Sequence, residues 1–420
     1  MLETIFSRGM ELFALATPIS LAATNILFFP IAILWLIGAR WTMRRWPPVW
    51  GWPEKLFLIY LGLSLLSAFL GVDPRHSLRE IKNKDFYILI LIVMVALIRR
   101  KEESVRLLKL FMGAGLATAL FGILQFAMGI NLSERSAQAY VFHMPTFAAH
   151  WPQPILNLLT LVDSRVLGTR GHPLAYAECL LFNWAFAICF LLASRGRQAL
   201  KWIVYLLIVG LALLVSQGRG PWIAAGVITA AAMLMTPWRR MLPLVALGAF
   251  FVATFAAVPT FRSRAMSILD RSHHSNIERM HMWHAGIAMW KTHPLLGVGP
   301  GNVKPLSAAF QTPDEKVWGL WGHLHSIYVN CLAERGALGL AAFLLFMGAY
   351  VVEMWGAMCR ANSDPRLRAV DQATLLGMLG FFLGGITESS YNTAVVIMTF
   401  YFVLGLAASL SRHHHETAQL

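Results

Sequence analysis

Charged side chains are scarce in this sequence. Asp, Glu, Lys and Arg make up 13% of its 420 residues, whereas hydrophobic residues make up 57%. A soluble globular chain averages about 25% charged residues, so the composition excludes an ordinary soluble enzyme. The mean hydropathy of +0.59 agrees with that exclusion. We therefore expect a polytopic membrane protein.

Cysteines are few and are not spaced for a structural or metal-binding role. The chain has four, Cys179, Cys189, Cys331 and Cys359, and none of them forms a CxxC pair. All four fall in or beside apolar stretches, so neither a disulfide framework nor a zinc site is expected. A signal-peptide pattern with a small-residue cleavage site is also lacking.

Acidic residues are the scarcer of the two charged kinds. Lys and Arg number 35 against 21 Asp and Glu, which leaves a formal net charge of +14. In a soluble chain this excess would suggest nucleic-acid binding. In a membrane protein, basic residues are concentrated in the loops of one membrane face, which explains such an excess. We therefore expect no nucleic-acid partner.

Apolar runs bounded by charged or turn residues predict the membrane helices. They lie near 54–70, 85–98, 107–128, 173–193, 200–215, 221–236, 241–258, 326–355, 372–388 and 393–410. The run from Glu11 to Ala39 is too long for one crossing and too short for two, and Pro18, Asn25 and Pro30 allow a pair of short helices. The predicted fold is an all-α polytopic membrane protein with eleven or twelve transmembrane helices and a periplasmic helical loop region.

The Lys/Arg bias of short loops orients these helices. The loops predicted to be cytoplasmic lie around 40–55, 99–109, 195–201, 239–240, 360–368 and 412. The opposite face receives 71–84, 129–172, 216–220, 259–325 and 389–392. Among these outer segments only 71–84 is both short and basic, with Arg75, Arg79, Lys82 and Lys84.

Three parts of the chain follow from this division. They are 1–258, a membrane bundle of nine helices with the outer loop 129–172; 259–325, a large periplasmic loop; and 326–420, the remaining helices and a cytoplasmic tail. A structureless loop as long as 259–325 is uncommon in a compact protein. Helical spacing within it, at Ile277, Met280, His284, Ile287 and Ala288, predicts amphipathic helices lying over the outer membrane face.

Two histidines stand where a polar loop becomes a long apolar helix, in His323-Leu324-His325-Ser326. Unsatisfied N–H groups at a helix start lower the pKa of an imidazole, and a neutral imidazole is a competent general base. The alternative is an interfacial histidine satisfied by water. On a helix, His323 and His325 would point to different faces, which disfavours a metal pair.

Arginines beside apolar runs suggest an anionic ligand. Arg219, in Ser216-Gln217-Gly218-Arg219-Gly220, stands so close to hydrocarbon that it costs about 2.5–3.5 kcal/mol without a partner. Snorkelling into headgroups is the alternative. Arg170, in Arg170-Gly171-His172-Pro173, and Arg279 offer two further cations on the outer side. Guanidinium groups hold phosphate oxygens bidentately, so the three could converge on one polyanion.

Two other polar stretches allow a structural and a functional interpretation. Gly297-Val298-Gly299-Pro300-Gly301-Asn302 lacks the Lys-Ser/Thr and the strand–helix context of a phosphate loop, which favours a tight turn. Glu388 lies at a helix end, where it either pairs with a buried arginine or caps the membrane segment.

The ordered set of these motifs resembles the O-antigen ligase family. It comprises Ser216 to Trp222, Arg279 with Trp283, Pro294 to Asn302, His323-Leu324-His325-Ser326, and Glu334-Arg335-Gly336-Ala337-Leu338-Gly339. The same superfamily holds O-antigen polymerases and protein O-oligosaccharyltransferases. The specific motifs begin at about residue 165.

The resemblance implies a twelve-helix glycosyltransferase of the bacterial inner membrane with its active site facing the periplasm. It would move a finished glycan from undecaprenyl diphosphate to the outer core sugar of lipid A-core. The family's essential histidine falls on His325 and its essential arginines on Arg219 and Arg279, while Arg262 or Arg264 is an alternative for Arg279. The residues expected to bind substrate are Arg170, His172, Arg219, Arg279, His323 and Glu388.

The chemistry of such a transfer fits these residue types. A base takes the proton of the acceptor hydroxyl, and cations stabilise the charge that develops on the leaving diphosphate. The outer carboxylates Asp73, Glu80, Asp163 and Asp270 form no DxD cluster, so arginines are expected to replace a metal, with no cofactor. Direct attack on the anomeric carbon would invert its configuration.

Other activities remain open at the level of sequence. An O-antigen polymerase would use the same donor with a second lipid-linked glycan as acceptor. A protein O-oligosaccharyltransferase usually carries a further periplasmic domain, for which we expect no room after His325. A lipid-linked glycan transporter or flippase would line a pathway with arginines, but the sequence shows no internal repeat or paired broken helices.

Overall fold

The computed structural model describes residues 2–41, 51–98, 100–128, 130–132, 159–161, 165–312, 322–361 and 364–418. Helices dominate these residues, which confirms the predicted all-α class. The strands β1 (Ile130–Leu132) and β2 (Leu159–Leu161) add one short antiparallel pair. Most of the predicted outer loop 129–172 lies outside the described residues.

The first forty residues form two helices, as the prolines predicted. They are α1 (Leu2–Ile19) and α2 (Leu21–Trp41), separated at Ser20. The Ser20 side chain accepts a hydrogen bond from the Ala23 N–H at 3.3 Å, which caps the start of α2.

Seven described helices are long and apolar enough to cross a membrane. They are α3 (Trp52–Leu70), α6 (Lys101–Met128), α8 (Pro173–Ala193), α9 (Arg197–Val215), α15 (Ile327–Arg360), α16 (Pro365–Thr387) and the 394–412 part of α17 (Ala394–Ala418). An eighth span results if α11 (Leu242–Ala257) and α12 (Pro259–Met266), bent by 96°, are one span.

The other apolar helices do not meet that criterion, α1 because of its charged residues and the rest because of the length of their apolar part. α5 (Ile88–Leu97) and α10 (Arg219–Leu234) have 10 and 16 residues, whereas a crossing needs about 20. Length and composition therefore support seven or eight spans, fewer than the eleven or twelve expected. The remaining helices of the described chain are α4 (Pro74–Lys84), α13 (His274–Thr292), α14 (Val303–Phe310) and the short η1 (Asp85–Tyr87), η3 (Trp238–Arg240) and η6 (Ser390–Asn392).

Helices from the two predicted membrane parts, 1–258 and 326–420, pack into one hydrophobic core. Aromatic rings join them, with centroid distances of 5.7 Å for Phe13–Phe402, 5.5 Å for Phe57–Phe346 and 6.4 Å for Phe182–Phe400. The parts 1–258 and 326–420 are thus interleaved in space. α8 and α17 are the most enclosed of the long helices and form the centre of the bundle.

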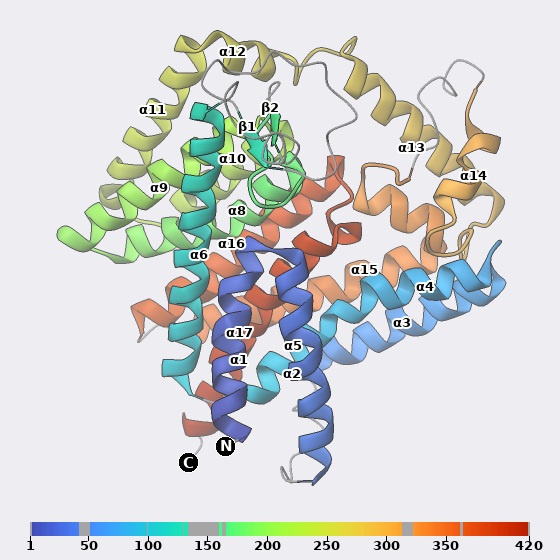
Figure 1. The fold of residues 1–420 in the computed structure, drawn as a ribbon, viewed down its shortest axis with the longest axis horizontal. Coiled ribbons are helices and arrows are strands. Elements are labelled where there is room, and N and C mark those ends of the chain that lie inside the picture. The colour runs from blue at the N-terminus through green and yellow to red at the C-terminus, as the bar shows by residue number, and fades with distance from the viewer. Residues whose placement is uncertain are drawn as a thin grey trace.

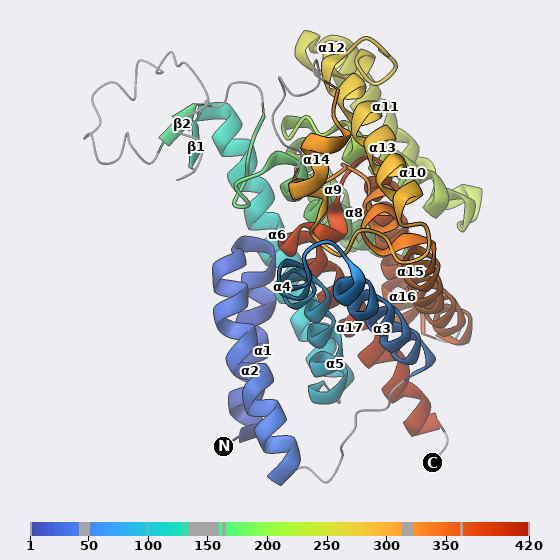
Figure 2. The ribbon, with the colours of Figure 1, turned by 90° about the vertical axis from the view of Figure 1, so that its right-hand side faces the viewer.

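The two ends of the helix bundle hold different segments of the chain. Both chain termini lie at one end, and α12 lies at the other (Figures 1 and 2). The ion pairs Lys101–Asp364 and Arg412–Glu54 join segments that were predicted to be cytoplasmic. The backbone hydrogen bond of 3.0 Å from Val72 N–H to the Val298 carbonyl joins two segments predicted to lie outside.

The glycine-rich stretch 297–302 fills a break in α15. Gly336 has a left-handed φ of 67°, and the chain resumes its helix after it. At this break the N–H groups of Val298 and Gly299 donate to the carbonyls of Ala333 and Glu334, both at 2.9 Å. These amides are therefore engaged with backbone, and the structure confirms a turn rather than a phosphate loop.

The helix predicted in the outer loop is present as α13, and its two faces differ in burial. Met280 and Ile287 are 50% and 37% exposed. The residues buried instead are Met282, Ala285, Gly286 and Met289. A Cβ on Gly286 would lie 2.6 Å from Leu324 and 2.7 Å from Val329, so this helix docks by close approach at a glycine.

Candidate active site

Glu388 joins two side chains that are remote in sequence. Its carboxylate pairs with Arg279 from α13 through Oε1, and His325 Nδ1 lies 2.9 Å from its Oε2. Because a carboxylate only accepts hydrogen bonds, His325 donates through Nδ1. The predicted pairing of Glu388 with an arginine is confirmed, and the bond to His325 is an additional finding.

The surroundings of Glu388 keep it ionised. Burial raises the pKa of its carboxyl, but the hydrogen bond from His325 and the charge of Arg279 outweigh burial and lower that pKa below its ordinary value. The carboxylate therefore carries a full negative charge at neutral pH, next to the imidazole.

Buried hydrogen bonds hold the segment that follows Glu388. Ser390 donates to Glu178 on α8 at 2.6 Å, and Tyr391 donates to Asp85 at 3.0 Å. Asp85 is itself paired at 3.0 Å with the buried Arg335 of α15. Glu388 is thus fixed between α8, η1 and α15, and the cost of leaving such buried groups unpaired opposes its displacement.

The two histidines differ from their predicted arrangement. They precede α15, whose N-cap is Ser326, and His325 has a left-handed φ of 44°. Their rings are in contact, with centroids 4.3 Å apart. The expectation that they point to different faces is wrong, because this segment is a turn rather than a helix.

His323 supports the backbone of His325. The N–H of His325 donates to His323 Nδ1 at 3.4 Å, so that nitrogen carries no proton. Burial and the neighbouring His325 lower the pKa of His323 to about 4. Burial also lowers the pKa of His172, and Glu388 opposes that shift, which places His172 within the electrostatic reach of the same carboxylate.

Arg219 binds both the C-terminal end of α12 and the first turn of α13. One terminal nitrogen donates to the Ser267 carbonyl at 2.7 Å, and the other donates to the Ser275 hydroxyl at 2.5 Å and to Asn276 at 2.8 Å. All of these acceptors are uncharged. The guanidinium charge is therefore retained at the start of α10, in the electrostatic field of Arg279 and Glu388.

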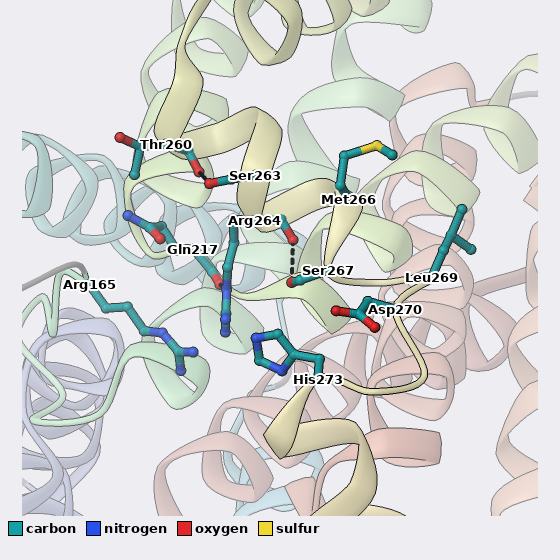
Figure 3. Close-up of a pocket in the computed structure, with 10 residues that line it drawn as sticks. All are labelled: Arg165, Gln217, Thr260, Ser263, Arg264, Met266, Ser267, Leu269, Asp270 and His273. Atoms are coloured by element: carbon teal, nitrogen blue, oxygen red, sulfur yellow. Dashed lines mark hydrogen bonds between the residues drawn. The ribbon is translucent and has the colours of Figure 1, made fainter.

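A pocket of about 880 Å³ lies beside Arg219, beneath α12 (Figure 3). Arg165, Arg264 and His273 direct their side chains toward it, and Ser263 and Ser267 add hydroxyl groups to its wall. The Nε of Arg264 donates to the Gln217 carbonyl at 3.3 Å. The pocket is thus lined by cationic and hydrogen-bonding groups, by Asp270, and by the apolar side chains of Met266 and Leu269.

Arg165 lines the pocket, although the sequence analysis predicted Arg170 and not Arg165 as a substrate-binding residue. The Arg170 guanidinium donates to the carbonyl of Thr17 at the end of α1. Arg165, five residues earlier, lines the pocket and acts electrostatically on Arg219. Both belong to the polar segment before α8, and only tertiary structure distinguishes them. Arg262 is exposed, whereas Arg264 faces the pocket.

Comparison with known families adds an independent finding. Residues 203–344 match the family described as O-antigen ligase. The matched segment contains Arg219, Arg279 and His325, whereas Glu388, His172 and Arg165 lie outside it. No curated protein matches the chain.

Proposed function

We propose that this protein is an O-antigen ligase that transfers a glycan from undecaprenyl diphosphate to a sugar hydroxyl of lipid A-core. The observation that carries the proposal is Glu388, which holds His325 and Arg279 together beside an arginine-lined pocket. The family match supports a membrane glycosyltransferase of the ligase or polymerase type. The proposed reaction inverts the anomeric carbon and uses no metal.

His325 is the proposed general base. Because its Nδ1–H is donated to Glu388, its Nε2 carries the lone pair that accepts the proton of the acceptor hydroxyl. The hydroxyl oxygen then forms the new bond to the anomeric carbon, and the bond from that carbon to the diphosphate oxygen breaks. The diphosphate leaves with the electron pair, and the proton remains on His325.

The proposed clamp for the diphosphate consists of arginines. Arg219 and Arg279 act electrostatically on each other and share the field of Glu388, and Arg165 and Arg264 line the adjacent pocket. Fixed guanidinium groups stabilise the charge on the leaving oxygen without reorganising during the reaction. Arg170, on the end of α1, would support the clamp indirectly.

Unpaired buried polar atoms on the two segments that carry Arg279 and Glu388 suit a sugar. Within the described part of the chain, Arg279 Nε, Trp283 Nε1 and Ser389 Oγ are buried without a hydrogen-bond partner. Ser389 follows Glu388, and Trp283 lies one helical turn after Arg279 and packs against the cluster that contains Leu324. Hydroxyl groups of a glycan would satisfy these atoms, which otherwise cost free energy.

The proposed topology has twelve crossings, with the site in the periplasm. Two termini at one end of the bundle require an even number of crossings (Figures 1 and 2). Twelve is reached when α1, α2, α5, α10 and α11 are counted with the seven candidate spans. The Lys/Arg bias supports cytoplasmic termini in a bacterial inner-membrane protein.

The polymerase and flippase alternatives lead to different expectations. A polymerase would accept a second lipid-linked glycan in place of lipid A-core, on the same residues. A flippase would use broken helices to bind its cargo, but the break in α15 at Gly336 is occupied by backbone from 298–299. That occupation favours an enzyme.

Reconstitution tests the proposal. The purified protein in detergent, given lipid-linked O-antigen and lipid A-core without an ion gradient, should form the ligated product and release undecaprenyl diphosphate. Activity should survive excess EDTA, because arginines supply the positive charge. Extension of the donor glycan without capping of lipid A-core would establish the polymerase instead, and activity restored only by Mg²⁺ or Mn²⁺ would refute the metal-free mechanism.

A further inference from the structure

The basic segment before η1 has no role in the reaction described above. It forms α4, which begins with Asp73 as its N-cap, accepting from the His76 N–H at 3.0 Å, and with Pro74 in its first turn. In the proposed topology α4 lies on the outer face, where the Lys/Arg bias disfavours a short basic segment. α4 also runs crosswise to α1, α2 and α6 (Figures 1 and 2).

One face of α4 packs against the glycine-rich turn 297–302. Ser77 and Ile81 are buried, and Asn302 donates to the Ser77 hydroxyl at 3.2 Å. His76 Nε2 lies 3.2 Å from the Gly301 carbonyl. These contacts attach α4 to the glycine-rich turn, so the rotation of the helix about its own axis is determined.

The opposite face presents three basic side chains. Arg75, Arg79 and Lys82 are exposed, and their spacing of four and three residues aligns them along one side of the helix. The acids of α4 do not neutralise them, because Asp73 caps the helix and Glu80 pairs with Lys84 at 2.5 Å. No ion pair to these three residues occurs within the described ranges. The stripe is about 10 Å long.

The C-terminal end of α4 leads to the active site. Lys84 acts electrostatically on His323, whose ring contacts His325. Asp85, the next residue, pairs with Arg335 in the network that also holds Tyr391. A ligand bound along α4 would therefore have its adjoining part directed toward the proposed base.

We propose that Arg75, Arg79 and Lys82 form a docking surface for the phosphate groups of a phosphorylated glycolipid, the acceptor of the transfer. The proposal rests on the proposed function for the identity of the acceptor. Phosphate carries the complementary charge and offers the oxygen geometry that guanidinium binds bidentately. The length of the stripe suits a ligand with more than one phosphate. The hydrogen bond that connects Asp85, directly after α4, to Tyr391 near Glu388 favours a substrate over bulk lipid.

A binding measurement tests this surface without requiring turnover. The full-length protein in nanodiscs of zwitterionic lipid would be titrated with bisphosphorylated lipid A-core and with the same glycolipid after enzymatic dephosphorylation. The variant Arg75→Ala/Arg79→Ala/Lys82→Ala should bind the phosphorylated form about 10- to 100-fold more weakly. Its affinity for the dephosphorylated form should equal that of the parent protein.

Two matched variants complete the experiment. Arg195→Ala/Arg197→Ala/Lys201→Ala removes three exposed basic residues around the start of α9 and should leave binding unchanged. Arg75→Lys/Arg79→Lys/Lys82→Arg keeps the charge and should retain most of the affinity. Equal weakening by both alanine triples, equal weakening with dephosphorylated glycolipid, or full competition by anionic phospholipid vesicles would each overturn the proposal.

Kinetics separates this proposal from the proposed function. If the parent protein transfers glycan, the alanine triple on α4 should raise the KM for phosphorylated acceptor and leave kcat and the donor KM unchanged. A parent protein that binds phosphorylated glycolipid through α4 but transfers nothing would contradict the proposed function alone. Transfer with an acceptor KM that the triple does not change would contradict the docking surface alone.

Discussion

Among single residues, Glu388 connects the charged groups of the candidate site. It receives a hydrogen bond from His325 and an ion pair from Arg279, while its neighbours Ser390 and Tyr391 are anchored to Glu178 and Asp85. A carboxylate that orients an imidazole in this way also stabilises the imidazolium formed during the reaction. The catalytic proposal can therefore be tested by substituting the side chains that contact Glu388.

The first prediction concerns His325 as the base. His325→Ala should lower the transfer rate by about 10²- to 10⁴-fold, the usual contribution of a general base, and leave donor binding nearly unchanged. Rates and donor affinity would be measured on protein of equal thermal stability. His293→Ala, at an exposed histidine, is the control. Full activity in His325→Ala would assign the base to another residue.

The second prediction concerns the pH response of His323. Its pKa in the folded protein, about 4, is below the ordinary value of 6.5, so the folded state disfavours the protonated form. Stability from this group is complete above pH 6.5 and is lost as pH falls toward 4. His323→Asn should reduce that loss of stability, because Asn does not titrate and its side-chain oxygen can accept the same N–H. His323→Ala should also lower the transfer activity about 3- to 10-fold at pH 7, because the hydrogen bond to the His325 N–H is lost.

Melting temperatures of the parent protein and the two variants between pH 7 and pH 4 would check this prediction. If the parent and His323→Asn lose stability in parallel over that range, titration of His323 does not cause the loss. If His323→Ala is as active as His323→Asn at pH 7, the hydrogen bond to the His325 N–H is not required.

Among the helices, α15 depends on the break at Gly336. A Cβ added there would lie 2.3 Å from the Leu295 carbonyl, and φ is 67°. Gly336→Ala should therefore lower the free energy of unfolding by about 1–3 kcal/mol. Gly348→Ala, in the same helix with open space around its Cβ, should be neutral or slightly stabilising. Equal melting temperatures for the two variants would contradict this account.

Arg219 acts on the scale of elements as well, because it joins α10 to the α12–α13 loop. Arg219→Lys keeps the charge but cannot donate to Ser267, Ser275 and Asn276 in their present directions. We expect it to lose most transfer activity and to increase amide hydrogen exchange in 267–276. If lysine supports full activity, only the charge of Arg219 matters.

At the scale of the whole molecule, the orientation in the membrane is the main prediction. With Cys359→Ser as background, Ser272→Cys should react with a membrane-impermeant thiol reagent added outside the cell. The native exposed Cys359 should react only after the membrane is opened. The reverse pattern would contradict both the topology and the periplasmic site.

The sequence alone determined the helices and the kinds of residue in the site. Length of an apolar run is a local property, so the run predicted near 173–193 coincides with α8. The break between α1 and α2 likewise followed from local turn residues. His325, Arg219 and Glu388 were found because a polar side chain at the end of an apolar run is unusual in any membrane protein.

Only the tertiary structure decided which of these residues meet. Glu388 reaches His325 across 63 positions of sequence, and Arg165 rather than Arg170 faces the pocket. The contact of α13 with Leu324 and Val329 also came only from the tertiary structure, because α13 docks there through Gly286, which contributes no hydrophobic side chain. Such contacts depend on how close two backbones approach and on the rotation of each helix, and neither quantity is recorded in a local pattern of residue types.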